Sequence, residues 1–306
     1  MSKTFLITGA TGKQGGGTVD ALLASPEASD STILAVTRNP HSPGAQKLAS
    51  KAKNIKIVKG DFNNVPAMFD AAREANGGKA EYDGLFLVQV PKDFKGQTPE
   101  KEEQQGKAMV DEAIKRRVRH FVYSSVDRHG ERSLQNPTPV PHFISKHNIE
   151  THLLEKAKDS NMTYTIIRPV AFLENLTPDF MGKMFATTWR EALGEVPLQL
   201  VSTTDIGIIA SKALLRPEEF RNRQMGLAGD DLNFNEANKI YKEKFGTELP
   251  TSYGFLANGF LWMVGEMNAM FKWFRDERYA ANIEECKKIN PDMMSFGDYL
   301  VKKFKT

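Results

Sequence analysis

Short apolar runs alternate with longer mixed segments along the first half of the chain. The short runs are rich in Val, Ile, Phe and Thr and are bounded by Gly, Pro, Asp or Ser, which is typical of buried strands. The longer segments place apolar residues at helical spacing. The predicted strands are Thr4–Thr8, Thr32–Thr37, Ile55–Val58, Gly84–Val90, His120–Ser124 and Tyr164–Arg168, and the predicted helices are Gly15–Ala24, Pro66–Ala75, Glu100–Arg116 and Lys146–Asp159.

This alternation predicts an α/β fold with a Rossmann-type, doubly wound parallel sheet and helices on both of its faces. Beyond about residue 169 the pattern loosens into predicted helices over Thr203–Leu214, capped by Thr204 or Asp205, and over Asn235–Phe245. We therefore expect two domains. Residues 1–168 form the Rossmann domain, and residues 169–306 form a smaller, mostly helical C-terminal part that completes the sheet and covers the ligand cleft.

Composition and charge narrow the class of protein further. A chain of 306 residues with 40% hydrophobic residues and a net charge of +3 has enough apolar content for a large core and is not disordered as a whole. The single cysteine, Cys286, excludes an internal disulfide and suits a reducing compartment. Residues 1–9 contain no basic region followed by a long apolar run, so we expect no signal peptide. A cytoplasmic location is expected, with the nucleus as an open alternative.

A glycine-rich segment follows the first predicted strand directly. Gly9, Gly12 and Gly15 form a Gly-x-x-Gly-x-x-Gly pattern at the start of the first predicted helix. In dinucleotide-binding folds the first glycine permits a tight turn, the second lets the backbone approach a pyrophosphate, and the third lets the helix pack against the sheet. A structural turn is the alternative. The predicted cofactor loop comprises Gly9, Thr11, Gly12, Lys13, Gln14 and Gly15.

The end of the second predicted strand indicates which nicotinamide cofactor is bound. NAD-binding folds normally place Asp or Glu there, to hold the 2′-hydroxyl of the ribose. In this chain Arg38 stands at that position. A guanidinium group binds a phosphate bidentately, whereas a carboxylate would repel it. The sequence therefore predicts NADP(H), with Arg38 at the 2′-phosphate, and a solvated surface arginine is the alternative.

The next strand ends carry further candidate residues. Asp61 follows the third predicted strand and can accept a hydrogen bond from the adenine amino group, with Phe62 beside the ring. Asp61 can equally cap the helix that follows. Gln89 and Val90 end the fourth predicted strand, where the backbone of such folds usually contacts the cofactor.

Candidate catalytic residues begin at the end of the fifth predicted strand. Ser125 stands beside the expected nicotinamide position and can orient a carbonyl oxygen, although ending a strand is the commoner role of such a serine. His142 and Lys146 follow, four residues apart. Because Pro139 and Pro141 favour an extended approach, we expect the helix to begin just after His142.

These motifs together resemble those of the NmrA-like family, a group of atypical short-chain dehydrogenases/reductases. The resemblance extends past residue 207 and implies a Rossmann fold that binds NADP(H), with Phe172 and Asn175 as additional cofactor-binding residues. The residues that carry it are Thr8–Gly15, Thr37–Pro40, Gly60–Asp61, Tyr123–Ser125, His142–Phe143 with Lys146, Arg168–Pro169, Leu173–Leu176 and Ser202–Gly207.

The chain departs from ordinary short-chain dehydrogenases at the proton donor. Those enzymes use Tyr-x-x-x-Lys, in which the tyrosine donates a proton and the lysine holds the ribose. Here Lys146 is kept, but His142 replaces the tyrosine. A histidine can donate a proton near neutral pH, but the resemblance to non-catalytic family members favours a structural histidine beside the cofactor. The candidate catalytic residues are thus His142, Lys146 and Ser125, and the histidines and cysteine form no metal-binding pattern.

Two functions from different classes follow. The first hypothesis, which the resemblance implies and the missing tyrosine supports, is a redox-sensing regulator that binds NADP(H) and acts through a protein partner such as a transcription factor. The alternative is an NADPH-dependent oxidoreductase that reduces a hydrophobic carbonyl, quinone or enone. We expect no direct contact with nucleic acid and none with a membrane, and a homodimer is an open alternative.

Overall fold

The computed structural model of the chain describes residues 2–89, 97–253 and 265–304. Contacts between Cα atoms divide the chain into two compact units, which are interleaved along the sequence. Unit 1 comprises residues 1–125, 145–167 and 206–224, and unit 2 comprises residues 126–144, 168–205 and 225–306. The two-domain division at residue 168 stays a prediction.

A seven-stranded sheet has the strand order β3-β2-β1-β4-β5-β6-β9. The pairings among β1 to β6 are parallel, which gives the order that is typical of dinucleotide-binding Rossmann folds. The α/β class and the Rossmann-type sheet expected from the sequence are therefore confirmed. The strands are β1 (Thr4–Ile7), β2 (Thr32–Thr37), β3 (Ile55–Lys59), β4 (Gly84–Leu87), β5 (His120–Ser124), β6 (Thr163–Pro169) and β9 (Arg223–Leu227).

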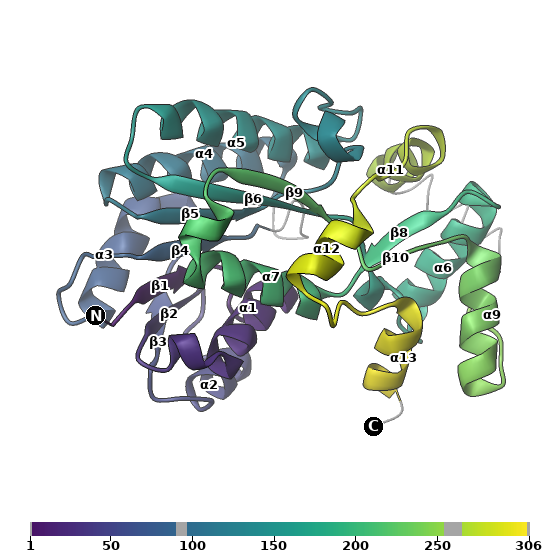
Figure 1. Cartoon of the computed structure of the whole chain (residues 1–306), viewed down its shortest axis with the longest axis horizontal. Coiled ribbons are helices and arrows are strands. Elements are labelled where there is room, and N and C mark those ends of the chain that lie inside the picture. The colour runs from purple at the N-terminus through teal and green to yellow at the C-terminus, as the bar shows by residue number, and fades with distance from the viewer. Residues whose placement is uncertain (1, 90–96, 254–264, 305–306) are drawn as a thin grey trace. The chain divides into compact units, whose positions relative to one another are not determined.

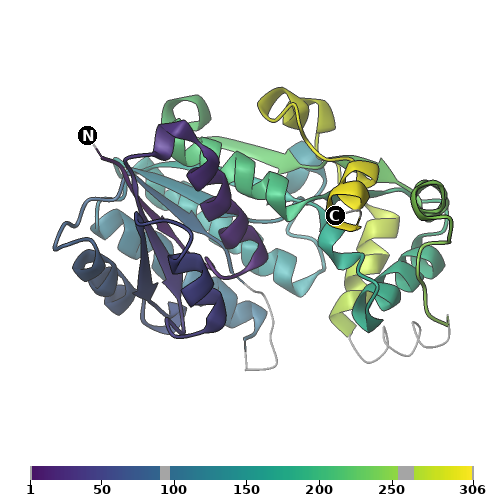
Figure 2. The same cartoon turned by 90° about the horizontal axis from the view of Figure 1, so that it is seen from below.

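Helices cover both faces of the sheet in unit 1, as a doubly wound fold requires (Figures 1 and 2). On one face α1 and α7 pack closely, since a Cβ atom on Gly207 would lie 2.3 Å from the backbone of Gly17. The other face carries α3, α4 and α5. The helices are α1 (Lys13–Ala24), α2 (Pro43–Ala49), α3 (Val65–Ala75), α4 (Pro99–Lys115), α5 (Pro141–Lys158), α7 (Thr203–Leu215) and α8 (Pro217–Phe220), with 3-10 turns η1 (Pro26–Ala28) and η2 (Phe62–Asn64).

The core of unit 1 fills the space between the sheet and this second group of helices. Phe121 on β5 and Leu85 on β4 meet Phe69 from α3 and Met109 from α4, and each has no more than 1% of its surface exposed. Removing such side chains from water supplies roughly 1.5–3 kcal/mol each. Tyr123, which the sequence places inside a strand, lies fully buried in the same cluster.

Unit 2 contains a second, three-stranded sheet that the sequence pattern did not reveal. Its order is β10-β8-β7, with β7 and β8 parallel and β8 and β10 antiparallel. Helices make up most of the rest of the unit, as expected for a mostly helical C-terminal part. The elements are η3 (Gly130–Leu134), β7 (Ala171–Phe172), η4 (Leu173–Asn175), α6 (Phe180–Leu193), β8 (Leu198–Val201), β10 (Asp230–Leu232), α9 (Phe234–Phe245), α11 (Gly265–Asp276), α12 (Ile283–Ile289) and α13 (Phe296–Phe304).

Several boundaries near the candidate site differ from those expected: β1 ends at Ile7 rather than at Thr8, and α1 begins at Lys13 rather than at Gly15. Helix α5 begins at Pro141, so the prediction of an extended approach to His142 was wrong. Proline is well tolerated in the first helical turn, because its missing N–H group would have no partner within the helix. Strand β4 ends at Leu87 rather than extending to Val90, and Val90 lies outside the described residues.

The start of α7 is capped by neither of the two residues expected: the hydroxyl of Ser202, directly before the helix, accepts from the N–H of Thr204 at 3.0 Å. The carboxylate of Glu174 accepts hydrogen bonds from the N–H of Thr203 at 2.9 Å and from its hydroxyl at 2.7 Å. Asp205 instead faces the segment after α12, where its two oxygens accept from Asn290 Nδ2 at 3.0 Å and from Met294 N at 3.1 Å. Asp205 is fully buried, and this desolvation raises its pKa from 3.8 to about 6.

The raised pKa of Asp205 predicts a pH-dependent contribution to stability. Because the folded chain holds the proton more tightly than the unfolded chain, the free energy of unfolding should fall as the pH rises from about 4 to about 6. A shift of this size corresponds to about 2–3 kcal/mol. Asp205→Asn cannot titrate at this position and so does not lose this stability as the pH rises. The free energy of unfolding of the variant minus that of the wild type should therefore increase by this amount from pH 4 to pH 7.

Urea unfolding at a series of pH values measures this difference, with Asp292→Asn, a change at an exposed carboxylate, as the matched control. Parallel stability curves for Asp205→Asn and the wild type would contradict the assignment.

Candidate functional site

The turn between β1 and α1 has the backbone geometry that the glycine pattern predicts. Gly9 has a φ of +57°, in the left-handed region that favours glycine, and a Cβ atom there would lie 2.9 Å from the side chain of Val88. The N–H of Gly12 donates to the carbonyl of Gly9 at 2.8 Å, which closes the turn. A Cβ atom on Gly15 would lie 2.3 Å from the same carbonyl, so only glycine lets the helix approach the turn this closely.

The first turn of α1 has the form of an anion-binding site. Its N-cap residue is Gly12, which has no side chain with which to cap the helix, whereas α2 is capped by the hydroxyl of Ser42 and α4 by that of Thr98. Gly9, Thr11, Gly12 and Lys13 are all exposed. Backbone N–H groups and the positive end of the helix dipole make such a helix start suited to a phosphate.

Hydrogen bonds tie this loop to the ends of the neighbouring strands. Thr8, at the end of β1, donates from its hydroxyl to the carbonyl of Phe86 and accepts from the N–H of Val88, both at 3.0 Å. The hydroxyl of Ser124, at the end of β5, donates to Gln14 Oε1 at 2.6 Å. The first turn of α1 therefore lies at the carboxyl edge of the sheet, where ligands bind in open α/β folds.

The residues expected around the adenosine lie at successive strand ends. Arg38 directly follows β2 and is exposed. Asp61 accepts from the backbone N–H of Asn63 at 2.9 Å and from its side chain at 2.8 Å, so it caps η2 in the way that the alternative interpretation proposed. Phe62 is half-buried and packs against the core of unit 1. Contacts of Arg38, Asp61 and Phe62 with a nucleotide stay predictions.

A buried charged network surrounds Lys146. Its ammonium group donates to Glu102 Oε1 at 2.8 Å, and the hydroxyl of Ser145 donates to Glu102 Oε2 at 2.5 Å. Gln89 joins the network, because its Nε2 donates to the backbone carbonyl of Glu102 at 3.0 Å. Glu102 was not among the residues predicted from the sequence. A buried lysine requires an acidic partner, but nothing in the sequence indicated which carboxylate would supply it.

His142 has an acidic partner of its own, within unit 2. Its Nδ1 lies 2.7 Å from Glu266 Oε1, and its backbone N–H donates to the same oxygen at 3.3 Å. Because a carboxylate can only accept, this contact places a proton on Nδ1. Glu266 therefore orients the imidazole and also satisfies a backbone donor at the start of α5. The side chains of His142 and Glu266 are each 16% exposed.

The remaining candidate residues occupy both units. Ser125 follows β5 in unit 1, is 6% exposed, and donates its backbone N–H to the carbonyl of Ile167 at 2.8 Å. Phe172 lies on β7 and Asn175 in η4, both in unit 2 and both half-buried. Their roles stay predictions.

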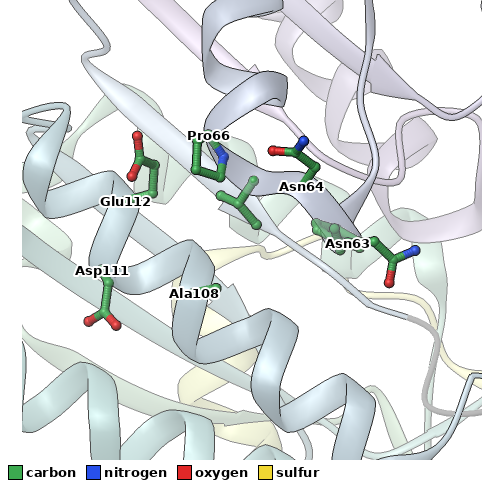
Figure 3. A pocket seen from close by; sticks show the side chains of 8 residues that line it. Asn63, Asn64, Pro66, Ala108, Asp111 and Glu112 are labelled. Atoms are coloured by element: carbon green, nitrogen blue, oxygen red, sulfur yellow. The ribbon is translucent and has the colours of Figure 1, made fainter.

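An open hollow of about 350 Å³ lies between the start of α3 and the middle of α4 (Figure 3). Phe62 contributes to its wall, but no residue of the glycine-rich loop does. The residues that line it include no lysine or arginine, so the hollow offers no cationic group to hold a phosphate. It therefore adds nothing to the predicted cofactor site.

Within residues 2–89, 97–253 and 265–304, no three His, Cys, Asp or Glu side chains gather in a way that could hold a metal ion. In the same ranges no helix is both long enough and apolar enough to cross a membrane. Cys286 is fully buried, which raises the pKa of its thiol, so it is unsuited to redox sensing.

The parallel sheet, its strand order and the glycine turn at its carboxyl edge define the class of dinucleotide-binding Rossmann-type proteins. More specifically, the chain belongs to the NmrA-like family, whose sequence pattern it matches over residues 1–300. This confirms the resemblance expected from the motifs and extends it over nearly the whole chain.

The chain is similar in sequence to a named oxidoreductase and in structure to a reductase and to a transcriptional regulator. The chain is 35% identical over 252 residues to the NmrA-like family domain-containing oxidoreductase hkm9 of Aspergillus hancockii, which covers 77% of this chain and 70% of that protein. The structure of the present chain resembles that of triphenylmethane reductase of Citrobacter sp. complexed with NADP(H). The TM-score is 0.73 and the sequence identity 18%, and the match covers 98% of this chain and 99% of that chain. The structure also resembles NmrA, a negative transcriptional regulator, with a TM-score of 0.70, 16% identity and coverage of 100% and 96%. At such identities the two structural likenesses establish the fold alone.

Gly12 provides a direct test of the cofactor loop. Gly12→Val would place a branched side chain where we expect the pyrophosphate, so calorimetry should detect no NADP(H) binding. The backbone of Gly12 is extended (φ −92°, ψ 178°) and accessible to valine, and the new Cβ atom would lie 3.1 Å from the Gly9 carbonyl. The free energy of unfolding should therefore change by no more than about 1 kcal/mol.

The matched control is Gly297→Val in α13, where a Cβ atom would have no neighbour closer than 3.6 Å. Binding that persists in Gly12→Val would contradict the pyrophosphate contact, and a Gly12→Val chain that does not fold would show that Gly12 is chiefly a structural turn.

Proposed function

We propose that this protein is an NADP(H)-dependent oxidoreductase. The observation that carries the proposal is the turn from β1 into α1, where Gly9 has a positive φ, Gly12 is the N-cap and Gly15 permits close packing. A dinucleotide fits this arrangement, because the start of α1 is exposed and uncapped and Gly12 places no Cβ atom where the pyrophosphate would lie. The relative at 35% identity bears the name of an oxidoreductase, which supports redox chemistry at this site.

The choice of NADP(H) over NAD(H) rests on Arg38. It directly follows β2, where a carboxylate would otherwise select the free 2′-hydroxyl. An exposed guanidinium at this strand end is suited to the 2′-phosphate. The neighbouring fold of triphenylmethane reductase was solved with NADP(H), whereas NmrA has been solved with NAD, so the fold is compatible with both cofactors.

The expected chemistry is the reduction of a hydrophobic carbonyl, quinone or enone. The bound nicotinamide would supply the hydride, and one proton completes the reduction. Lys146 would hold the ribose. His142 lies one helical turn before Lys146 on α5, so the two residues share a face of this helix. Because Glu266 holds both the imidazole and the backbone N–H of His142, we assign His142 a structural role at the helix start, with water as the proton source.

A redox-sensing regulator is the second candidate. The observation that favours it is the histidine at position 142, where ordinary short-chain dehydrogenases have their proton-donating tyrosine. In this case the protein would bind NADP(H), change its conformation with the redox state of the cofactor, and contact a protein partner without turnover.

An absorbance assay separates the two candidates. The purified chain is incubated with NADPH and a panel of quinones, enones and aryl ketones, and the loss of NADPH absorbance is followed. Turnover above that of Gly12→Val supports the oxidoreductase. NADPH binding by calorimetry without turnover on any substrate of the panel would favour the regulator.

Arg38→Ala tests the cofactor preference. Removing a charge-assisted contact to the 2′-phosphate should weaken NADP(H) binding about 10- to 100-fold and leave NAD(H) binding nearly unchanged. Calorimetry with both cofactors measures the two affinities. Arg73→Ala, a matched change of an arginine in the last turn of α3, serves as the control. Equal losses for NADP(H) and NAD(H) would contradict the assignment of Arg38 to the phosphate.

His142→Ala tests the structural role of this histidine. If His142 only completes the start of α5, kcat should change less than about tenfold, whereas loss of a general acid lowers it 10²–10⁴-fold. His147→Ala on the same helix is the matched control. A loss in the larger range, with the affinity for NADPH unchanged, would instead make His142 the proton donor.

A further inference from the structure

We propose that Glu102 is a positioning residue, which fixes the Lys146 ammonium group in place for the ribose of the cofactor. This inference rests on the NADP(H) binding proposed above. Glu102 is fully buried, and its two carboxylate oxygens accept from Lys146 Nζ at 2.8 Å and from Ser145 Oγ at 2.5 Å. The two carboxylate oxygens of Glu102 therefore accept hydrogen bonds from two consecutive residues of α5.

The network lies at the edge of the sheet that the cofactor requires. Gln89 comes two residues after the end of β4, and its side chain donates to the backbone carbonyl of Glu102 at 3.0 Å. This bond fixes the first turn of α4 to the carboxyl end of β4. Lys146 is thereby held close to the strand ends where dinucleotides bind in open α/β sheets.

Close packing of α4 against α5 sets the distance between the two charges. A Cβ atom on Gly106 would lie 2.3 Å from Ile149 Cδ1, so the helices touch at this glycine. Glu102 lies one turn before Gly106, and Lys146 lies nearly one turn before Ile149. The contact between Gly106 and Ile149 therefore holds α4 and α5 close together. One turn nearer the start of both helices, this brings the Glu102 carboxylate to the Lys146 ammonium.

Stability alone does not account for this ion pair. Removing two charges from water costs several kcal/mol for each ion, and a buried pair is often no more stabilising than apolar residues of the same volume. The pair does, however, remove the rotamer freedom of a long lysine side chain before a ligand arrives, which lowers the entropic cost of binding. The exposed fractions agree with this function: the Lys146 side chain is 9% exposed and that of Glu102 is 0% exposed, so the lysine is the more accessible member of the pair.

Glu102→Gln tests the proposal through cofactor affinity, measured by calorimetry with NADP(H) in the absence of substrate. The amide keeps the size of the side chain but loses the charge that holds Lys146, and we expect Kd to rise about tenfold or more. Lys146→Met should weaken binding at least as much. In the Lys146→Met background, Glu102→Gln should cause no further loss, because the effect of Glu102 passes through the lysine.

Two other variants keep the test decisive. Glu103→Gln is the matched control, since the neighbouring Glu103 pairs with Lys107 and Asn148 instead, and its Kd should equal that of the wild type. Ser145→Ala leaves both charges in place and should raise Kd about 2- to 10-fold even if Glu102→Gln does not fold.

The outcomes separate this inference from the proposed function. A wild-type chain that binds no NADP(H) overturns both. If the wild type binds NADP(H) and folded Glu102→Gln binds it with the same Kd, the role of Glu102 alone is overturned. Losses that add up in the double variant Glu102→Gln/Lys146→Met have the same meaning. If Glu102→Gln does not fold, an unchanged Kd in Ser145→Ala has the same meaning.

Discussion

The closeness of α1 to the turn after β1 is the constraint on which the candidate site depends. At Gly15 the helix approaches the Gly9 carbonyl so closely that a single methyl group would lie 2.3 Å from it. Contacts of this kind cannot relax, because the obstructing atoms belong to the backbone. The N-terminus of α1 is therefore directed along the carboxyl edge of the sheet, and the hydrogen bonds of Thr8 and of Gln14 hold the adjoining strand ends in register with it.

Sequence reasoning identified the parts of the fold that depend on local pattern. Buried parallel strands read as short apolar runs, and the strand ends predicted at Thr37 and Ser124 agree with the structure. The glycine turn was predictable because Gly9 and Gly15 answer backbone requirements that no other residue meets, while Gly12 leaves the start of α1 without a side chain. The small sheet of unit 2 was not, since β7 and β10 have two and three residues, too few to show any periodicity.

The side-chain partners of the site could not be predicted, for a different reason. Lys146 and His142 were both found from their spacing, but their partners Glu102 and Glu266 lie 44 and 124 residues away along the chain. Glu174 likewise accepts from the first N–H of a helix that begins 29 residues later, beside the local N-cap Ser202. Each contact depends on tertiary packing, and a glutamate whose partner lies this far away looks in the sequence like any solvated surface residue.

The burial of Cys286 has a practical consequence for following the folding of this protein. It is the single cysteine of the chain, it lies in unit 2, and its thiol donates to the carbonyl of Gly226 at 3.3 Å. A thiol reagent can reach it only when α12 separates from the strand that carries Gly226. The rate of thiol labelling would therefore report the local opening of unit 2, with no cysteine elsewhere in the chain to obscure the signal.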